Sequence, residues 1–364
     1  MSEVTLRAGP HRRAWCPTWF DAPDGAAPPA CQVSGDRAAC IVTDLDAGGE
    51  LTLDGSVAPA AGGVAVDERD GALDVSVGGA PWCSYRYTPG DVRPVLHPVA
   101  GPHGIPMTRA WPLADDVADE ETDHVHHRSC WVAHGLVNGV DFWSEAEGHG
   151  RQARVALDAV ESGPVFGRIA ERLCWESAAG DPVVDEHRTL VFWNTPERLR
   201  MIDISVGFRA AHGAVLFGDT KEGGIVSLRV PEAIKETRGG TMVSGSGGIG
   251  EGECWGQRAP WVDYFGTLAD PRGEPRTVGI AVLDHPRNPH YPTFWHIRAY
   301  GLLSANPFGL ADFRSSYQER GDWTLEAGAT ATFRYRIVLH EGDAGQAAIG
   351  DRFADWAWPP QVGA

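Results

Sequence analysis

The chain has 364 residues, 43% of them hydrophobic, so it can bury a large core as one large domain or two ordinary ones. Its 31 basic and 49 acidic residues give a net charge of −18, which argues against nucleic acid and anionic membrane surfaces as partners. No run approaches the roughly 20 apolar residues of a membrane-spanning helix, and the first residues hold no apolar signal-peptide core, so we expect a cytoplasmic protein.

The first 62 residues are rich in Ala, Gly and Pro and show little periodicity apart from residues 49–53. We expect residues 1–62 to form a small β appendage. The main body, which carries the site, is predicted over residues 63–341. Residues 342–364 are predicted as a C-terminal helix and tail, with the helix at residues 344–356.

The body shows apolar alternation with a period of two, which is typical of half-buried strands. The clearest runs cover residues 154–160, 187–193, 202–208, 225–230, 277–283 and 333–339. Many strands with few helices predict an all-β fold, a large antiparallel β-sandwich, with a galactose-mutarotase-like supersandwich favoured. A β-propeller is the main competitor, but no repeat of about 40 to 50 residues is present to indicate blades.

Residues 123–143 read DHVHHRSCWVAHGLVNGVDFW and hold the densest group of ionisable and aromatic side chains. Imidazole titrates near neutrality, so such a cluster can supply general acids, general bases or metal ligands. A structural, hydrogen-bonded role is the alternative for each histidine taken singly. The candidates from this segment are His126 and His127 as catalytic residues, and Trp131, His134 and Trp143 as substrate-binding residues.

A metal site is the minority interpretation of this segment. On a strand, His124 and His126 would project to the same face, and an H-x-H pair of this kind can bind a divalent metal. The glutamate expected a few residues later in a cupin is replaced by Ser129, Cys130 and Trp131. The seven cysteines are scattered and include no C-x-x-C pair, which argues against a disulfide framework and a thiolate zinc site. We therefore expect no required cofactor, with a divalent metal possible.

Further candidates come from segments before and after this one. Glu222 is a candidate catalytic carboxylate because it stands between glycines in GDTKEGG, although an exposed hairpin turn with a solvated Lys221–Glu222 pair would explain the same pattern. The proline-rich segment 284–298 predicts an ordered loop entering a strand and adds His296 as a catalytic candidate. The remaining substrate-binding candidates are Arg93, His97, Arg109, Lys221, Trp261, Asp263, His285 and Trp295.

Five of these motifs together resemble the PmoA-like family, whose function is poorly defined. They are RPVLHPV at Arg93, the segment 123–143, DTKEGG at Asp219, WGQRAPWVDY at Trp255 and the segment 284–309. The family usually shows Pro where this chain has Val125. The family's label refers to a membrane subunit of methane monooxygenase, which this sequence, without a membrane span, does not match. The resemblance implies a bacterial β-sandwich protein found with sugar oxidoreductases and glycan-degrading enzymes.

The leading hypothesis is a carbohydrate-active enzyme in which His126 or His127 and Glu222 move protons on a small saccharide or glycoside while aromatic rings stack on the sugar. Hydrolytic or eliminative glycoside cleavage and an epimerase-type proton shift all remain open. One alternative is a non-catalytic sugar-binding or sensing protein, indicated by the fourteen tryptophans. Another is a metal-dependent enzyme with a His124/His126 site.

Overall fold

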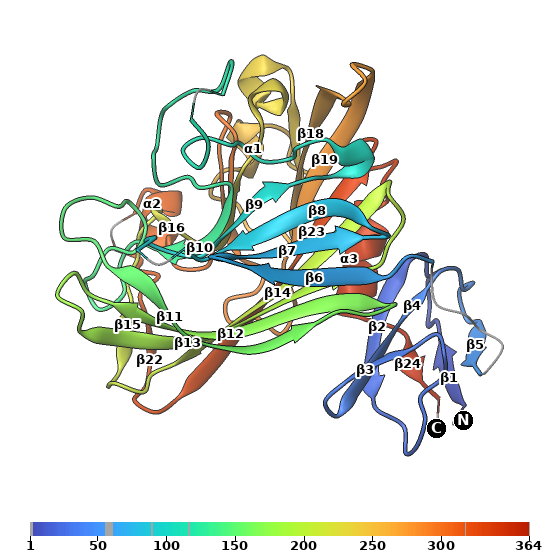
Figure 1. Cartoon of the computed structure of the whole chain (residues 1–364). Helices are drawn as coiled ribbons and strands as arrows, with labels where there is room; N and C mark the ends of the chain where they lie inside the picture. Colours follow the sequence, from blue (N-terminus) through green and yellow to red (C-terminus); the bar gives the residue numbers. More distant parts are fainter. Residues whose placement is uncertain (1–2, 55–60, 89, 116, 317, 364) are drawn as a thin grey trace.

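Two eight-stranded antiparallel sheets face each other in the computed structural model, which describes residues 3–54, 61–88, 90–115, 117–316 and 318–363 (Figure 1). We call them sheet I and sheet II. In sheet order, sheet I contains β20 (Phe294–Ile297), β21 (Leu302–Asn306), β16 (Gly223–Arg229), β10 (Cys130–His134), β9 (Val95–Val99), β8 (Ala80–Arg86), β7 (Ala72–Val77) and β6 (Val64–Arg69). Sheet II contains β11 (Arg151–Glu161), β12 (Phe166–Glu176), β13 (Pro182–Trp193), β14 (Leu199–Arg209), β23 (Thr330–Glu341), β19 (Pro275–Leu283), β18 (Trp261–Ala269) and β17 (Thr241–Ser244).

The prediction of a large antiparallel β-sandwich is confirmed. The alternating runs 202–208 and 333–339 lie on β14 and β23, which are direct neighbours with Ile204 opposite Tyr335 and Val206 opposite Phe333. These side chains join one continuous core with residues such as Leu73 of sheet I, because every second residue of each strand faces the opposing sheet.

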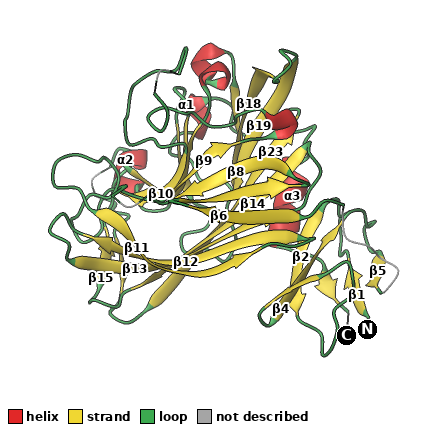
Figure 2. Cartoon of the chain, in the orientation of Figure 1, coloured by secondary structure: helices red, strands yellow, loops and turns green. Residues whose placement is uncertain are grey.

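Helices are few and lie at the margins of the sheets (Figure 2). They are α1 (Glu251–Cys254), α2 (Leu310–Arg314) and α3 (Ile349–Ala357), besides 3-10 turns at Pro102–Gly104, Glu232–Ile234 and Glu236–Arg238. The predicted helix at residues 344–356 is found as α3 but begins later, at Ile349. A two-stranded ribbon pairs β15 (Val215–Phe217) with β22 (Trp323–Leu325). None of the helices among the described residues is long and apolar enough to cross a membrane.

The N-terminal residues form two small sheets beside the sandwich (Figure 1). One pairs β2 (Cys16–Asp21), β4 (Arg37–Val42) and β3 (Gln32–Ser34), and the other pairs β24 (Gln361–Val362), β1 (Val4–Arg7) and β5 (Glu50–Leu53). They enclose a hydrophobic cluster of their own that includes Leu6 and Phe20. The tail is therefore not separate from this module, because its last strand, β24, lies alongside β1.

Candidate functional site

The outer face of sheet I carries an apolar cluster beneath long loops. Trp131 and Ala133 project outward from β10, and Trp143, from the connection to β11, packs against them together with Val95 and Leu302. The rings of Trp131 and Trp143 lie 5.5 Å apart, and the two residues are 2% and 0% exposed. They form a buried floor, so the expectation that they stack on a sugar ring is not met.

Asp123 organises the histidine-rich loop above this floor. Its carboxylate accepts hydrogen bonds from Arg229 at 3.0 and 2.9 Å, from Arg109, and from Nδ1 of His124 at 2.6 Å. Both guanidiniums are fully buried. Burial raises the pKa of Asp123, but the hydrogen bonds from His124 and the arginines outweigh it and hold that pKa well below its usual range. The carboxylate is thus a fixed anion that holds the loop.

His127 is part of this support. Arg229 donates from Nη1 to Nδ1 of His127 at 3.1 Å, and the imidazole stacks on Trp131 with ring centroids 5.3 Å apart. Burial, and then the neighbouring His126 and Arg229, lower the pKa of His127 far below its ordinary value. A buried, neutral imidazole whose Nδ1 is already an acceptor is poorly suited to exchange protons with a substrate, so the surroundings of His127 favour a structural role over a catalytic one.

His126 lies above His127 and is only half-buried. Its Nε2 is screened from solvent and has no hydrogen-bond partner among the described residues. Burial, followed by the charges of Arg93 and His124, lowers the pKa of His126 to about 4, although Glu222 opposes the shift. At neutral pH this imidazole is therefore uncharged, and its Nε2 is not committed to another described residue.

The turn that carries Lys221 and Glu222 is firmly held rather than free. Asn306 donates from Nδ2 to the carbonyl of Lys221 at 3.1 Å, and His296 donates from Nδ1 to the same carbonyl at 2.8 Å. The backbone N–H of Lys221 donates to Asp312 at 2.7 Å. These contacts fix the backbone at the start of β16, although the Lys221–Glu222 pair of the hairpin interpretation is present and partly exposed.

The Glu222 side chain is 45% exposed and accepts a hydrogen bond from Nζ of Lys221. Burial raises the pKa of Glu222. The hydrogen bond from Lys221 and the proximity of His296 and His126 lower it by more, so the net shift of the pKa is downward. Burial in turn lowers the pKa of His296 to about 4, with Glu222 opposing. Glu222 and the two histidines are thus close enough for their charges to perturb one another, although they come from three distant segments.

A second paired carboxylate, Glu145, stands near His126. Arg128 donates to both of its oxygens at 2.8 and 2.7 Å, and the buried Arg93 donates to one at 3.1 Å. Glu145 and Asp123 are therefore each held by two guanidiniums. Among the described residues, the carboxylate of Glu222 is hydrogen-bonded only to the ammonium group of Lys221. Among these three carboxylates, Glu222 is the one best placed to accept a proton.

Of the other candidates, Arg109 and Arg93 act as loop supports through the contacts above, and His134 is fully buried, with Nε2 bonded to the carbonyl of Gly218 at 2.8 Å. The structure does not bring five further candidates to this cluster. His97 lies beside Arg86. Both Trp261 and His285 pack around α3 and the outer face of sheet II. Asp263 pairs with His340 at 3.0 Å, and Trp295 is in the sandwich core. Trp295 and His296 are adjacent on β20, so they face opposite sides of the sheet.

The expected geometry for a His124/His126 metal site is absent. These residues lie in a loop, not on a strand, and His124 has a left-handed backbone with φ of 41°. Nδ1 of His124 is already bonded to Asp123. Within the described part of the chain, the one group of three donors placed to hold a metal lies elsewhere, at Cys174, Asp185 and His212.

The sequence did not single out Tyr300, which faces the histidine-rich loop. Its ring stacks on His124 with centroids 5.0 Å apart, and the guanidinium of Arg229 lies 4.7 Å from its centre. Burial raises the pKa of Tyr300 to about 12, which keeps its hydroxyl protonated at neutral pH. Its position four residues after His296, in a turn between β20 and β21, was the available signal, but a single tyrosine in a loop is not distinctive.

Comparisons with known proteins place the chain by family but not by function. Residues 72–354 match a family described as a family of unknown function (DUF6807). The resemblance to PmoA-like proteins stays a prediction. No curated protein matches the sequence.

Solved structures with similar folds include the heparan sulfate lyase HepC from Pedobacter heparinus, at 9% identity and a TM-score of 0.32. The alignment covers 77% of this chain and 36% of the lyase, so the chain spans little more than a third of that protein's length. A GalM/aldose epimerase homologue from C. elegans aligns at 11% identity and a TM-score of 0.31, covering 78% of this chain and 99% of its own. The Slr1438 protein from Synechocystis sp. PCC 6803 aligns at 11% identity and a TM-score of 0.31, covering 79% and 99%. Similarity at this level supports no argument about function.

Proposed function

Because this chain belongs to the DUF6807 family, whose function is unknown, we propose an activity from the site itself: acid–base chemistry on a small saccharide or glycoside, with Glu222 and His126 as the proton-transferring pair. The observation that carries the proposal is the placement of Glu222. In the described part of the chain it is a half-exposed carboxylate without a guanidinium partner, and it lies close to the imidazole of His126, whose Nε2 has no hydrogen-bond partner there.

The protonation states suit a carboxylate base. The lowered pKa of Glu222 keeps it ionised at neutral pH, and the pKa of about 4 keeps His126 neutral. Glu222 would accept a proton from a hydroxyl or an activated carbon of the substrate. The neutral imidazole of His126 would form a hydrogen bond to the reacting oxygen, and the hydroxyl of Tyr300 is a further protonated donor nearby.

The pairing of the other carboxylates bears on the reaction class. Hydrolysis by the usual glycosidase mechanisms uses two carboxyl groups on either side of the scissile bond. Here Asp123 and Glu145 are each held by two arginines, which leaves Glu222 as the single available carboxylate of the three. We therefore favour an epimerase-type proton shift or an elimination over two-carboxylate hydrolysis. Neither reaction requires a cofactor in this proposal.

The test is turnover of a panel of reducing sugars, uronic acids and aryl glycosides, followed by proton NMR for anomeric exchange, unsaturated products and released aglycone. Glu222→Gln and His126→Ala should each reduce kcat by about 100-fold or more, the contribution typical of a positioned acid or base. Glu147→Gln changes an exposed glutamate in the loop before β11 and should retain wild-type turnover.

Wild-type turnover in both Glu222→Gln and His126→Ala would refute these roles. Calorimetric binding of a saccharide that remains unaltered after long incubation with the wild-type protein would instead favour the sugar-binding alternative.

A further inference from the structure

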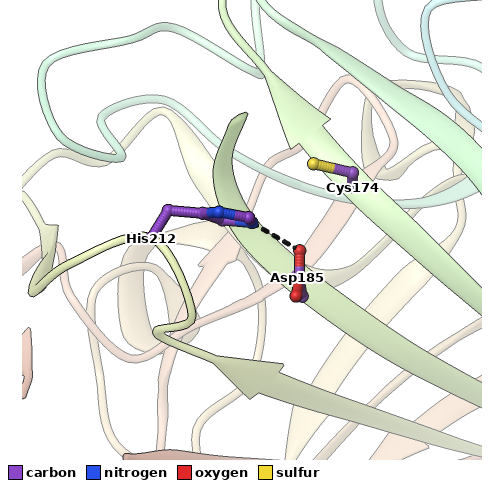
Figure 3. Close-up of side chains that lie close together, drawn as sticks. All are labelled: Cys174, Asp185 and His212. Carbon is purple, nitrogen blue, oxygen red and sulfur yellow. Dashed lines mark hydrogen bonds and ion pairs between the residues drawn. The ribbon is translucent and has the colours of Figure 1, made fainter. Parts of the chain in front are cut away.

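Three potential metal ligands meet on the outer face of sheet II, away from the site on sheet I. Cys174 of β12 lies directly opposite Asp185 of β13 in the antiparallel register, so their side chains share one face. His212 belongs to the loop that follows β14. Figure 3 shows its ring turned back toward Asp185, with Cys174 on the adjacent strand.

The donor atoms are close to coordination distance. One atom from each residue, the thiol sulfur, a carboxylate oxygen and an imidazole nitrogen, lies within 4.8 Å of the other two. Nε2 of His212 and Oδ1 of Asp185 are 2.8 Å apart. Zinc bond lengths of about 2.0–2.3 Å in a tetrahedral site imply donor separations of roughly 3.3–3.8 Å, so small side-chain rotations would suffice.

We propose that Cys174, Asp185 and His212 bind a zinc ion, with a fourth position open to water. A thiolate and an imidazole are the ligands that zinc prefers, whereas calcium and magnesium require mostly oxygen donors. Two strands and a loop supply the ligands, so the metal would tie the loop after β14 to sheet II. The site is independent of the function proposed for Glu222 and His126.

Carboxylates lie beside the thiol of Cys174. Cys174 is 9% exposed, and the thiol faces Asp185, with Glu176 also nearby. A bound cation would compensate the negative charge that these carboxylates and a thiolate bring together. A hollow of about 460 Å³ opens beside Asp185, with Arg172 and Arg209 in its wall. The open coordination position would therefore lie near a space large enough for a small anionic ligand.

The experiment is a cobalt titration of the reduced full-length protein, because a cobalt–thiolate bond gives a charge-transfer absorption that carboxylate and imidazole ligands do not. We expect one equivalent of Co²⁺ to produce this band and one equivalent of Zn²⁺ to remove it. Cys174→Ser should abolish the band. His212→Ala, which changes a side chain that is 33% exposed and is thus expected to fold, should weaken Zn²⁺ binding by at least about 100-fold in competition with a chromophoric chelator.

His187→Ala is the matched control. His187 stands two residues from Asp185 on the same face of β13, is 53% exposed and pairs with Asp158, so its loss should leave the affinity unchanged. Zinc at saturation should also raise the Tm of the wild-type protein but not that of His212→Ala. A titration without a charge-transfer band, or equal zinc affinity in His212→Ala and wild type, would overturn the proposal.

Discussion

Replacing Asp123 with asparagine tests whether the histidine-rich loop depends on one buried ionic centre. Asp123 pairs with Arg109 and Arg229, both of which are fully buried, so loss of its charge leaves two guanidiniums without an anion. Breaking one buried pair typically costs about 3–5 kcal/mol. Two features place the expected loss near the lower end of that range. The Asp123 side chain is 30% exposed, and Arg109 still donates to the carbonyls of residues 121, 123, 124 and 127.

We therefore expect Asp123→Asn to lower the free energy of unfolding by about 3 kcal/mol at neutral pH. Urea denaturation followed by tryptophan fluorescence measures the change. Asp115→Asn removes an exposed carboxylate in the same connection and should alter stability by less than about 0.5 kcal/mol.

The pH dependence supplies an independent check. The pKa of Asp123 is lowered in the folded protein, so its stabilisation is fully present above the unfolded value of about 3.9 and is lost as the pH falls toward the folded value. The difference between wild type and Asp123→Asn should be constant from about pH 5 to 8 and shrink below about pH 4. A difference under about 0.5 kcal/mol at neutral pH, or one that grows on acidification, would refute the reasoning.

Three further predictions concern the site and a buried ion pair between the sheets. The pKa of Glu222 is lowered and that of His126 is about 4, so turnover should stay constant through neutral pH and decline only below about pH 4.5. A pH–rate profile measures this, and a decline centred near pH 6.5 would contradict the assignment. Gly135→Ala would place a Cβ 2.4 Å from the carbonyl oxygen of Glu222. We therefore expect a lower Tm by calorimetry and a reduced turnover by NMR. An unchanged Tm and turnover would show that β10 and β16 separate easily. Arg188→Met leaves the buried carboxylate of Glu186 without its guanidinium and should lower the free energy of unfolding by about 3–5 kcal/mol in urea denaturation. A change under about 0.5 kcal/mol would contradict the expected dependence of the fold on this pair.

The fold was more predictable than the site because alternation is a local signal. Residues 202–208 and 333–339 each alternate, and each run forms a strand whose apolar side faces the core. The pattern does not say which sheet a strand joins. Trp261 lies in a polar and aromatic motif much like the one around His296, yet β18 belongs to sheet II and β20 to sheet I.

The residue types of the candidate site could be predicted from the sequence, but the role of each residue could not. The histidine-rich loop, Glu222 and His296 do meet, since β10, β16 and β20 all belong to sheet I. Which histidine is available depends on burial: His127 contacts Arg229 from a segment 102 positions away. Long-range contacts of this kind leave no periodic trace in the sequence.

The pairing of β24 with β1 has a consequence for biosynthesis. Val362 lies opposite Leu6, so the sheet that contains β1 is complete only after a segment about 350 positions later in the chain has been synthesised. During translation β1 can pair with β5 as soon as both have left the ribosome, but its other edge stays open until residues 361–362 emerge. Ribosome-bound nascent chains halted before residue 361 should therefore expose that edge to proteases and chaperones, whereas the released chain covers it.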